Sequence, residues 1–564
     1  MSGAGAGADA RTGPQPRAAE SVAVIGAGHN GLVCALLLAR AGFAVTLLEA
    51  ADEVGGCVWT DTDSRGLRRE RGAIDHGGVH ALAEDLGLAE HGLRFRERDT
   101  LAVFRVAGED RRFAVSAEET ASALGSDGPA YLDLAERAAS LFGMIDRFPE
   151  PPTLTQLATV LARLRGGDEL FRSLLAPARA VIEQAVTDPR TRAALELYAS
   201  HSQIPSWAPG SGAMAMMLPS GHGHAAVRPE GGSAALTGSL RRAFEAAGGT
   251  VRTGAAVREV RMAGAGGGTG AHPIVVLDSG ESLEAGRVVS TIGVPRTAAL
   301  LERAGSAPAA LRLDAASQRS GQFNVSELTV SITRASSAPL LDDDAIHFVQ
   351  SGLGDLHRGF GDLIAGRLPA SPWAMVADVP QDEGVTGSAV WLSSVVPIER
   401  ADGPWTSERE QQAGAAVIEA VSRQLDRDVA PEGSEVVVTG PLGWAERIGG
   451  IGNPNHVDLT LDQLFGWRPA SGRGARTEAP WLYLAGAGVH PGGGLSGASG
   501  RAAAEAVIAD ARGGARGNGA GGVRGVLAGA AGRVRSTVSG AADEAAGLVA
   551  AARSYRAMRK GSKR

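Results

Sequence analysis

Near the start of the chain, the order of apolar and polar residues predicts a strand, a helix and a second strand. Residues 22–25 form a short apolar run, as in a fully buried strand. The apolar segment 32–41 predicts a helix, and Gly42 is its C-terminal stop. A second apolar run at 43–48 predicts the next strand. We therefore expect a β-α-β unit within residues 21–60.

The turn between the first strand and the helix has the spacing G-x-G-x-x-G, in which the glycines are Gly26, Gly28 and Gly31. In a β-α-β unit these glycines allow a tight turn, a close approach of the backbone to a pyrophosphate, and close packing of helix on strand. The helix N-terminus adds unpaired N–H groups and a positive dipole end. Glu49 ends the second strand, where an acidic side chain accepts hydrogen bonds from ribose hydroxyls. The unit therefore predicts a dinucleotide site, with Ala27 and Asn30 among its backbone contacts.

A second glycine pair, Gly55 and Gly56, closely follows the sequence Leu48-Glu49-Ala50. The order G-x-G-x-x-G, L-E-A and G-G resembles the FAD-binding motif of the glutathione-reductase-like flavoprotein superfamily. This resemblance implies that the bound dinucleotide is FAD and adds Ala50 and the glycine pair to its contacts.

The middle of the chain has the pattern of a second cofactor-binding segment. Residues 233–247 predict a helix that ends at a Gly-Gly pair, and strand-like runs follow at 250–254 and 257–262. A hairpin turn at Ser279-Gly280 lies between two further runs, and 287–291 predicts another strand. This order resembles FAD-linked oxidases and desaturases, in which a three-stranded meander completes the cofactor domain. The resemblance implies an adenine contact for the backbone of Val257; a plain core position is the alternative.

The pattern of strand, glycine loop and helix recurs near the C-terminus. The apolar run 481–485 is followed by the loop GAGVHPGGGLSGASG and an alanine-rich helix at 501–511. Such a turn brings N–H groups to an anion. The strings LTLDQLFGWRP and LYLAGAGVHPGGGLSGASGRAAA are similar to phytoene-desaturase-like FAD-dependent oxidoreductases, in particular to the group named pyridine nucleotide-disulfide oxidoreductase domain-containing protein 2. The resemblance implies contacts to the pyrophosphate and ribityl chain from Gly486, Gly488, Gly494, Leu495 and Ser496.

Composition adds limits on compartment and partners. The chain has 564 residues, 44% of them hydrophobic and 21% charged, with a formal net charge of −7. Only two cysteines are present, which suits a reducing compartment, and no apolar window is long enough for a membrane span. We expect a cytoplasmic protein. Residues 512–564 hold eleven Arg or Lys against two acids; we interpret them as a solubilising tail, with peripheral membrane contact as the alternative and no nucleic acid expected.

Few side chains stand out as candidates for catalysis. His490, in the loop expected beside the flavin, is the candidate catalytic residue, either as a cofactor or substrate contact or as a residue that only satisfies loop carbonyls. Asp462 and Arg468 are weaker candidates. The cysteines are 23 positions apart, too far for a redox-active pair, so Cys34 is interpreted as core and Cys57 as core or a flavin contact. His222 and His224 lack companion ligands, so no metal site is predicted.

These observations predict an α/β chain with a Rossmann-like FAD-binding domain of discontinuous segments and an α+β substrate domain. The expected order is a disordered leader (1–19), a first FAD-binding segment (20–80), a mainly helical insertion of the substrate domain (81–220), a second FAD-binding segment (221–296), the remaining substrate domain (297–474), a third FAD-binding segment (475–511) and the basic tail (512–564). The resemblance implies an oxidoreductase that removes a hydride from an apolar, isoprenoid-like or carotenoid-like substrate to flavin N5. The alternatives are an amine oxidase, a flavin-dependent isomerase or saturase, and a non-enzymatic flavin-bound adaptor. The electron acceptor stays open between oxygen, quinone and NAD(P).

Overall fold

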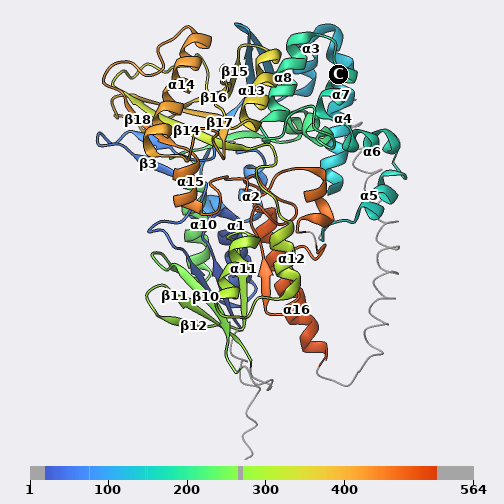
Figure 1. The fold of residues 1–564 in the computed structure, drawn as a ribbon, viewed down its shortest axis with the longest axis vertical. Helices are drawn as coiled ribbons and strands as arrows, with labels where there is room; N and C mark the ends of the chain where they lie inside the picture. The colour runs from blue at the N-terminus through green and yellow to red at the C-terminus, as the bar shows by residue number, and fades with distance from the viewer. Residues whose placement is uncertain are drawn as a thin grey trace, which may run out of the picture.

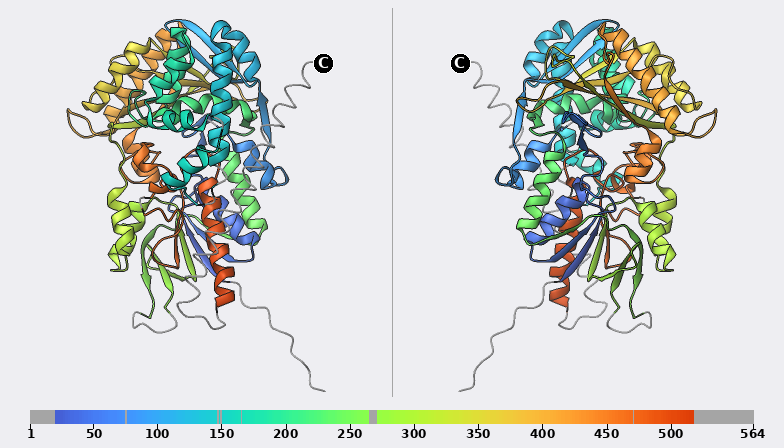
Figure 2. Two further views of the ribbon diagram at one scale, coloured as in Figure 1. Left: turned by 90° about the vertical axis from the view of Figure 1, so that its right-hand side faces the viewer. Right: turned by 90° about the vertical axis from the view of Figure 1, so that its left-hand side faces the viewer.

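A computed structural model describes residues 20–517 apart from 75, 146–147, 149, 165, 265–270 and 470. The predicted leader, and the predicted tail from residue 518 onward, lie outside the described residues. Two layered bodies stand one above the other (Figure 1), and the side views in Figure 2 agree with this arrangement. The lower body holds both ends of the described chain.

The lower body is built on a five-stranded parallel sheet of order β19-β13-β1-β2-β9. Its strands come from three distant parts of the sequence: β1 (Ser21–Ile25), β2 (Ala44–Leu48), β9 (Thr250–Arg252), β13 (Arg287–Ser290) and β19 (Leu482–Leu484). Helix α1 (His29–Arg40) packs against both α10 (Ala234–Ala246) and α16 (Ala498–Gly517) beside this sheet. The predicted order of strands and helices is therefore present, with α16 reaching six residues into the segment interpreted as tail.

The predicted meander is also present. Strands β10 (Val257–Met262), β11 (Pro273–Leu277) and β12 (Ser282–Glu284) form an antiparallel three-stranded sheet. Helices α11 (Val294–Arg303) and α12 (Ala309–Ser317) pack on each other, and α11 also contacts β10. Apolar side chains from the meander, α11 and the parallel sheet share one core.

The upper body is built on a seven-stranded mixed sheet of order β18-β14-β17-β16-β15-β6-β7. Its bounds are β6 (Thr100–Val106), β7 (Glu109–Ala114), β14 (Val325–Arg334), β15 (His347–Gln350), β16 (Ala374–Val379), β17 (Ser388–Pro397) and β18 (Glu435–Thr439). Helices α13 (Leu353–Ile364), α14 (Ser407–Leu425) and α15 (Pro441–Ile448) belong to the same region. Helix α14 packs its apolar face on β14, β15 and β18, which explains the burial of Val417 and Val421.

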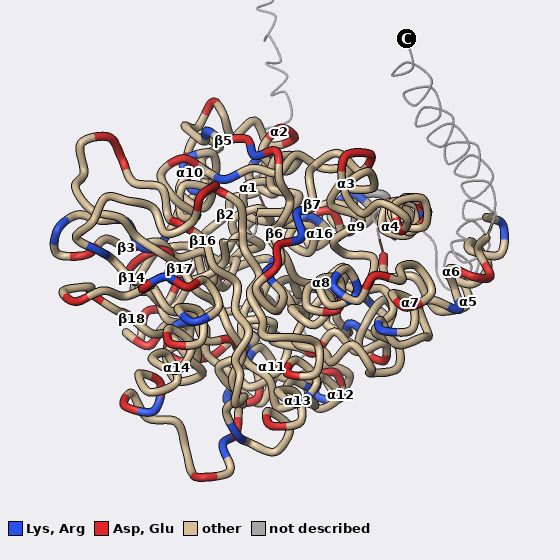
Figure 3. The backbone as a smooth tube through the Cα atoms, turned by 90° about the horizontal axis from the view of Figure 1, so that it is seen from above, with Lys and Arg blue, Asp and Glu red and all other residues tan. Residues whose placement is uncertain are grey.

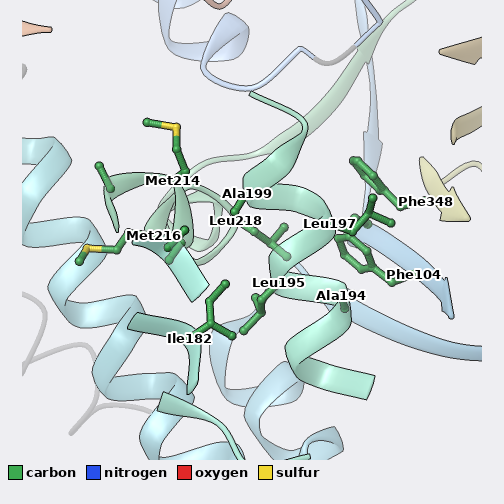
Figure 4. Close-up of a cluster of buried hydrophobic side chains, with 14 of the residues drawn as sticks. Phe104, Ile182, Ala194, Leu195, Leu197, Ala199, Met214, Met216, Leu218 and Phe348 are labelled. Carbon is green, nitrogen blue, oxygen red and sulfur yellow. The ribbon is translucent and has the colours of Figure 1, made fainter. Parts of the chain in front are cut away.

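The segment predicted as a mainly helical insertion also contributes two strands to this sheet. β6 pairs in parallel with β15, and β7 extends the sheet beyond β6. After β7 the segment is mainly helical, with α3 (Ala117–Ala123), α4 (Gly128–Ile145), α5 (Leu154–Leu161), α6 (Gly167–Leu175), α7 (Ala178–Ala185), α8 (Pro189–Ser200) and α9 (Met217–Ser220). Their apolar faces meet the sheet in one cluster, where Phe104 stacks on Phe348 at 4.8 Å between ring centroids (Figure 4).

Two small ribbons connect the bodies. β3 (Thr60–Thr62) pairs with β4 (Arg68–Glu70), and β5 (Phe95–Arg98) pairs with β8 (Ala226–Pro229). The hydroxyl of Ser331 in β14 donates to the carbonyl of Glu70, and Thr329 donates to the carbonyl of Arg71. The first ribbon therefore carries the chain from the glycine pair of the lower body to the sheet of the upper one. A short helix, α2 (Val79–Asp85), follows it.

Candidate functional site

The turn after β1 has the close packing that its glycines predict. Gly26 has a φ of +97°, and a Cβ on Gly31 would lie 1.9 Å from the Gly26 carbonyl oxygen. Only glycine at position 31 therefore lets α1 start this close to β1. Gly28 is the N-cap of α1 and has no side-chain cap, so the positive end of the helix dipole lacks a side-chain acceptor.

Glu49 is fixed by two backbone donors. The N–H of Ala27 donates to one carboxylate oxygen at 2.7 Å, and the N–H of Ala51 donates to the other at 3.0 Å. The neighbouring Ala50 is exposed. Each carboxylate oxygen has two lone pairs, so further acceptor capacity remains for hydroxyl groups of a ligand.

The glycine pair lies directly beside the first turn. Gly55 donates its N–H to the Ala27 carbonyl at 2.9 Å and forms an isolated parallel bridge with Gly28. A Cβ on Gly56 would lie 3.3 Å from the Cα of Gly28. The two glycine motifs therefore form one backbone cradle.

Val257 is joined to the same cradle through the backbone. The N–H of Ala255 donates to the Glu49 carbonyl at 2.7 Å, and the N–H of Gly254 donates to the Ala51 carbonyl at 2.9 Å. Val257 begins β10 two residues later and is half-buried against the core under the meander. Its predicted contact with adenine stays a prediction.

The C-terminal glycine loop meets the cradle from the other side. The N–H of Gly500 in α16 donates to Oδ1 of Asn30 at 3.2 Å, and His29 forms a hydrogen bond with the backbone of Gly494. A Cβ on Gly494 would meet nothing within 4 Å, whereas Leu495 is buried in the core below. Ser496 accepts a hydrogen bond from the Ala498 N–H. The predicted residues of the first and last segments therefore converge.

Three polar residues that the motifs did not reveal hold the two glycine turns, Ser499 and Gln318 at the C-terminal loop and Thr291 at the turn after β1. Ser499 both accepts from the Gly486 N–H at 2.7 Å and donates to the Gly486 carbonyl at 2.9 Å. Gln318 donates to the Gly488 carbonyl at 2.6 Å. Thr291 donates to the carbonyls of Ile25 and Gly26 at 2.9 and 3.0 Å. The glycine spacing carried no signal for Gln318 and Thr291, because their partners lie 170 and 266 positions away in the sequence.

Arg468, a weaker candidate in the sequence, supports the loop from inside. Its side chain is 1% exposed and donates to the carbonyls of Ala487, Asp458 and Gln463. Burial lowers its pKa to about 10, and the nearby Asp458 opposes that shift, so the guanidinium is charged at neutral pH. Asp462 lies at the surface in an ion pair with Arg319.

His490 lies in the loop that Arg468 supports and is bonded to Arg468 through its backbone. Its backbone N–H donates to the Arg468 carbonyl at 2.8 Å, and the residue is 5% exposed. The ring atom Nε2 is buried without a hydrogen-bond partner among the described residues. Burial, and secondly the charge of Arg468, lower the pKa of His490 to about 4. The imidazole is therefore neutral at pH 7, with one nitrogen left for a ligand.

The cysteines and the remaining histidines have structural surroundings. Cys34 and Cys57 are both free, and burial raises the pKa of each to about 12. The ring of His222 is bonded to the Tyr131 hydroxyl at 2.8 Å and to the Val115 carbonyl at 3.0 Å. Across the described ranges, no group of three or more His, Cys, Asp or Glu side chains is placed to hold a metal ion.

These residues fit FAD. The uncapped helix N-terminus suits a pyrophosphate, Glu49 suits ribose hydroxyls, and the unpartnered Nε2 of His490 suits a polar atom of a ligand. Seen from above, acidic and basic residues are interspersed along the described chain (Figure 3), so charge alone does not mark another site. Within the described segments, no helix has the length and hydropathy to cross a membrane.

A small cavity lies in the upper body. It has a volume of about 60 Å³ and apolar walls from Leu197, Phe348, Trp373, Met375 and Val395. Its polar lining comes from His201, Gln203, Glu327, Ser393, Ser394 and Asn455. A larger hollow of about 180 Å³ lies at the amino ends of β1 and β2, at the opposite end of the strands from the glycine turns. The second hollow is therefore separate from the cofactor site.

Comparison with known proteins gives the same assignment as the geometry. The model of the flavin containing amine oxidoreductase family matches residues 31–508. The pyridine nucleotide-disulfide oxidoreductase domain-containing protein 2 of Mus musculus is 27% identical over 86% of this chain and 93% of its own length. The hydroxyneurosporene desaturase of Cereibacter sphaeroides is 27% identical over 87% and 97%. The predicted resemblance is thus confirmed.

Solved structures show the same fold. Putrescine oxidase matches with a TM-score of 0.54 and 18% identity over 88% of this chain and all of the other. Cyclohexylamine oxidase from Brevibacterium oxydans matches with a TM-score of 0.52 and 16% identity over the same shares. At these identities the likeness concerns the fold alone. The predicted fold class, a Rossmann-like FAD-binding domain with a mixed-sheet substrate domain, is confirmed.

Proposed function

The chain belongs to the flavin containing amine oxidoreductase family, and we propose that it is an FAD-dependent dehydrogenase or desaturase acting on a largely apolar, isoprenoid-like substrate. The observation that carries the cofactor is the meeting of three distant segments at one cradle. There α1 begins without a side-chain cap at Gly28, the carboxylate of Glu49 keeps acceptor capacity beyond its two backbone donors, and Nε2 of His490 has no hydrogen-bond partner among the described residues. The similarity to the hydroxyneurosporene desaturase, which covers 87% of this chain, supports the substrate class.

In this proposal the protein's own residues bind the cofactor and orient the substrate. The N–H groups at the start of α1 bind the pyrophosphate, and Glu49 accepts from the ribose. Arg468 fixes the loop that carries His490, so that the neutral imidazole offers one nitrogen to the cofactor or the substrate. When bound, FAD supplies a hydride acceptor at N5. The apolar side chains in the lining of the upper cavity would contact substrate carbons and help to position the donor carbon.

An amine oxidase is the second candidate, and a specific residue favours it. Glu327 places a carboxylate in the lining of the cavity, where it would attract an ammonium group. Against it stands the low aromatic content of 4%, since an aromatic cage is a common way to hold an amine. A flavin-dependent isomerase or saturase would use the same cofactor site without net oxidation.

Anaerobic reduction of the bound flavin tests this proposal. The holoprotein is mixed without oxygen with an isoprenoid or with a primary amine, and flavin absorbance is followed. Bleaching by the isoprenoid alone supports a desaturase. Bleaching by the amine alone overturns it in favour of an amine oxidase. Flavin content is measured first, because a protein without flavin would refute both candidates.

A further inference from the structure

Gln203 lines the cavity of the upper body and has a buried acceptor without a partner among the described residues. The residue is 8% exposed, and its Oε1 atom is buried without a hydrogen-bond partner among the described residues. Its backbone has a φ of +66°, which is uncommon outside glycine. A buried, unpaired amide oxygen destabilises the folded state, so such a group is rare unless a ligand satisfies it. The side chain is thus held in an unfavourable state at the wall of a cavity.

Glu327 contributes a second acceptor to the same cavity. The Ser393 hydroxyl donates to one of its carboxylate oxygens at 2.7 Å, and the other oxygen accepts no hydrogen bond from the described residues. The Ser394 hydroxyl is used by the Trp373 carbonyl at 2.6 Å. Among the described residues that line the cavity, none is Arg or Lys. Glu327 therefore supplies a carboxylate that only accepts, whereas the described side chains of His201, Gln203 and Asn455 in the lining can both donate and accept.

The cavity lies on the side of the upper body that faces the cofactor cradle. The carboxylate of Glu327 acts on the Cys57 thiol and helps to raise its pKa, and Cys57 follows Gly56. On another wall, Asn455 precedes His456, whose Nδ1 would lie 3.3 Å from a Cβ on Gly293, just after β13. Both connections lead from the lining to the lower body.

We infer that this cavity binds the polar end of the substrate, and that Gln203 and Glu327 select an apolar molecule with one hydrogen-bond donor, a hydroxyl or an ammonium group, over a pure hydrocarbon. The inference rests on the proposed function for its location beside the flavin. A volume of about 60 Å³ holds only a few non-hydrogen atoms, which suits an end group but not a whole isoprenoid. The aromatic and aliphatic walls suit the adjoining carbons.

The test compares three ligands with one carbon skeleton: geraniol, geranylamine and 2,6-dimethylocta-2,6-diene. Binding to the holoprotein is measured by titration calorimetry, so that no turnover is needed. We expect the two donor-bearing ligands to bind about tenfold more tightly than the hydrocarbon. Equal affinity for all three would overturn the inference and leave a cavity filled by water.

Variants separate the two acceptors. Gln203→Leu removes the amide and should abolish the preference for both donor-bearing ligands, whereas Glu327→Gln keeps the shape and should weaken geranylamine alone if the end group is a cation. Gln350→Leu is the matched control, because Gln350 is also buried with an unpartnered Oε1 among the described residues but does not line the cavity. If Gln203→Leu fails to fold, Glu327→Gln and the ligand series still decide.

Failure of this inference can be distinguished from failure of the proposed function. A holoprotein whose flavin is never reduced by these ligands, but which binds them with the expected preference, would refute the oxidoreductase and keep the inference. Reduction of the flavin with no preference among the ligands would refute the inference and keep the oxidoreductase.

Discussion

The backbone N–H of Ala27, in the turn after β1, donates to a carboxylate oxygen of Glu49 at the end of β2, at 2.7 Å. This bond fixes the acidic side chain in one orientation before any ligand binds, and the Ala51 N–H fixes its other oxygen. Glu49→Ala should therefore lower the affinity for FAD by about 10- to 100-fold, since a charge-assisted hydrogen bond contributes roughly 1.5–3 kcal/mol. The affinity is measured by diluting the holoprotein and quantifying the FAD that is released.

The control for this variant is Glu53→Ala, which alters an exposed acid four residues further on. An unchanged flavin affinity in Glu49→Ala would show that the carboxylate has no role in binding the ribose.

Gly31→Ala should destabilise the fold as well as the site. The new Cβ would lie 1.9 Å from the Gly26 carbonyl oxygen, which is backbone and cannot rotate away. We expect a loss of about 3 kcal/mol in the free energy of unfolding, together with loss of flavin, measured by denaturant titration. Gly143→Ala in α4 meets no atom within 4 Å and should instead be neutral or stabilising. A stable, yellow Gly31→Ala protein would contradict the packing described for this turn.

Arg468→Met should loosen the C-terminal glycine loop. The guanidinium is the donor for the carbonyls of Ala487, Asp458 and Gln463, and the variant leaves these acceptors unpaired in a buried place. A loss of roughly 2–5 kcal/mol in unfolding free energy follows. Arg473→Met, at an exposed arginine, is the matched control. Equal melting temperatures for the two variants would mean that the loop does not depend on Arg468.

How far the sequence predicts this molecule depends on the range of the interactions. The strand, glycine turn and helix units at residues 21–48 and 482–511 are predictable, because their glycines and apolar runs act locally, whereas the extension of α16 to Gly517 is not predicted. Strands β6 and β7 are not predicted within the helical segment, since short runs with a covered face suit either structure and the partner β15 lies far along the chain.

In the candidate site, too, the residues set by local sequence are predictable and those set by distant contacts are not. Gly26, Gly28, Glu49 and the glycine pair follow a spacing that can be read from the chain. The unpaired acceptor of Gln203 results from burial by segments that no local pattern connects, so no motif signals it.

His490→Leu should alter the bound flavin while leaving the loop in place. The backbone N–H that bonds to Arg468 is retained, and only the unpartnered Nε2 is lost. We expect a shifted flavin absorbance spectrum or a weaker affinity for FAD. The apoprotein should unfold at nearly the same denaturant concentration as the parent. A variant with an unchanged spectrum, affinity and turnover would assign His490 to the loop alone.

Stability should fall as the pH drops below 6.5. Burial lowers the pKa of His29, His456 and His490 to about 4 and that of His76 to about 3, against 6.5 in the unfolded chain. The unfolded state therefore binds more protons between these values, so the stabilising contribution is complete above pH 6.5 and is lost toward pH 4.

Urea titrations at several pH values measure this slope. In His490→Leu the slope between pH 5 and 6 should fall by up to about 1.4 kcal/mol per pH unit, which corresponds to one proton. An identical slope in the parent and the variant would contradict a neutral, buried His490.

The central claim is that three separated segments of this chain form one FAD site, and the flavin content of the purified protein tests it most directly. The protein is denatured, and the released cofactor is identified and quantified against the protein concentration. We expect FAD at about one per chain in the parent and a marked loss in Glu49→Ala. A colourless parent that takes up no added FAD would contradict the claim.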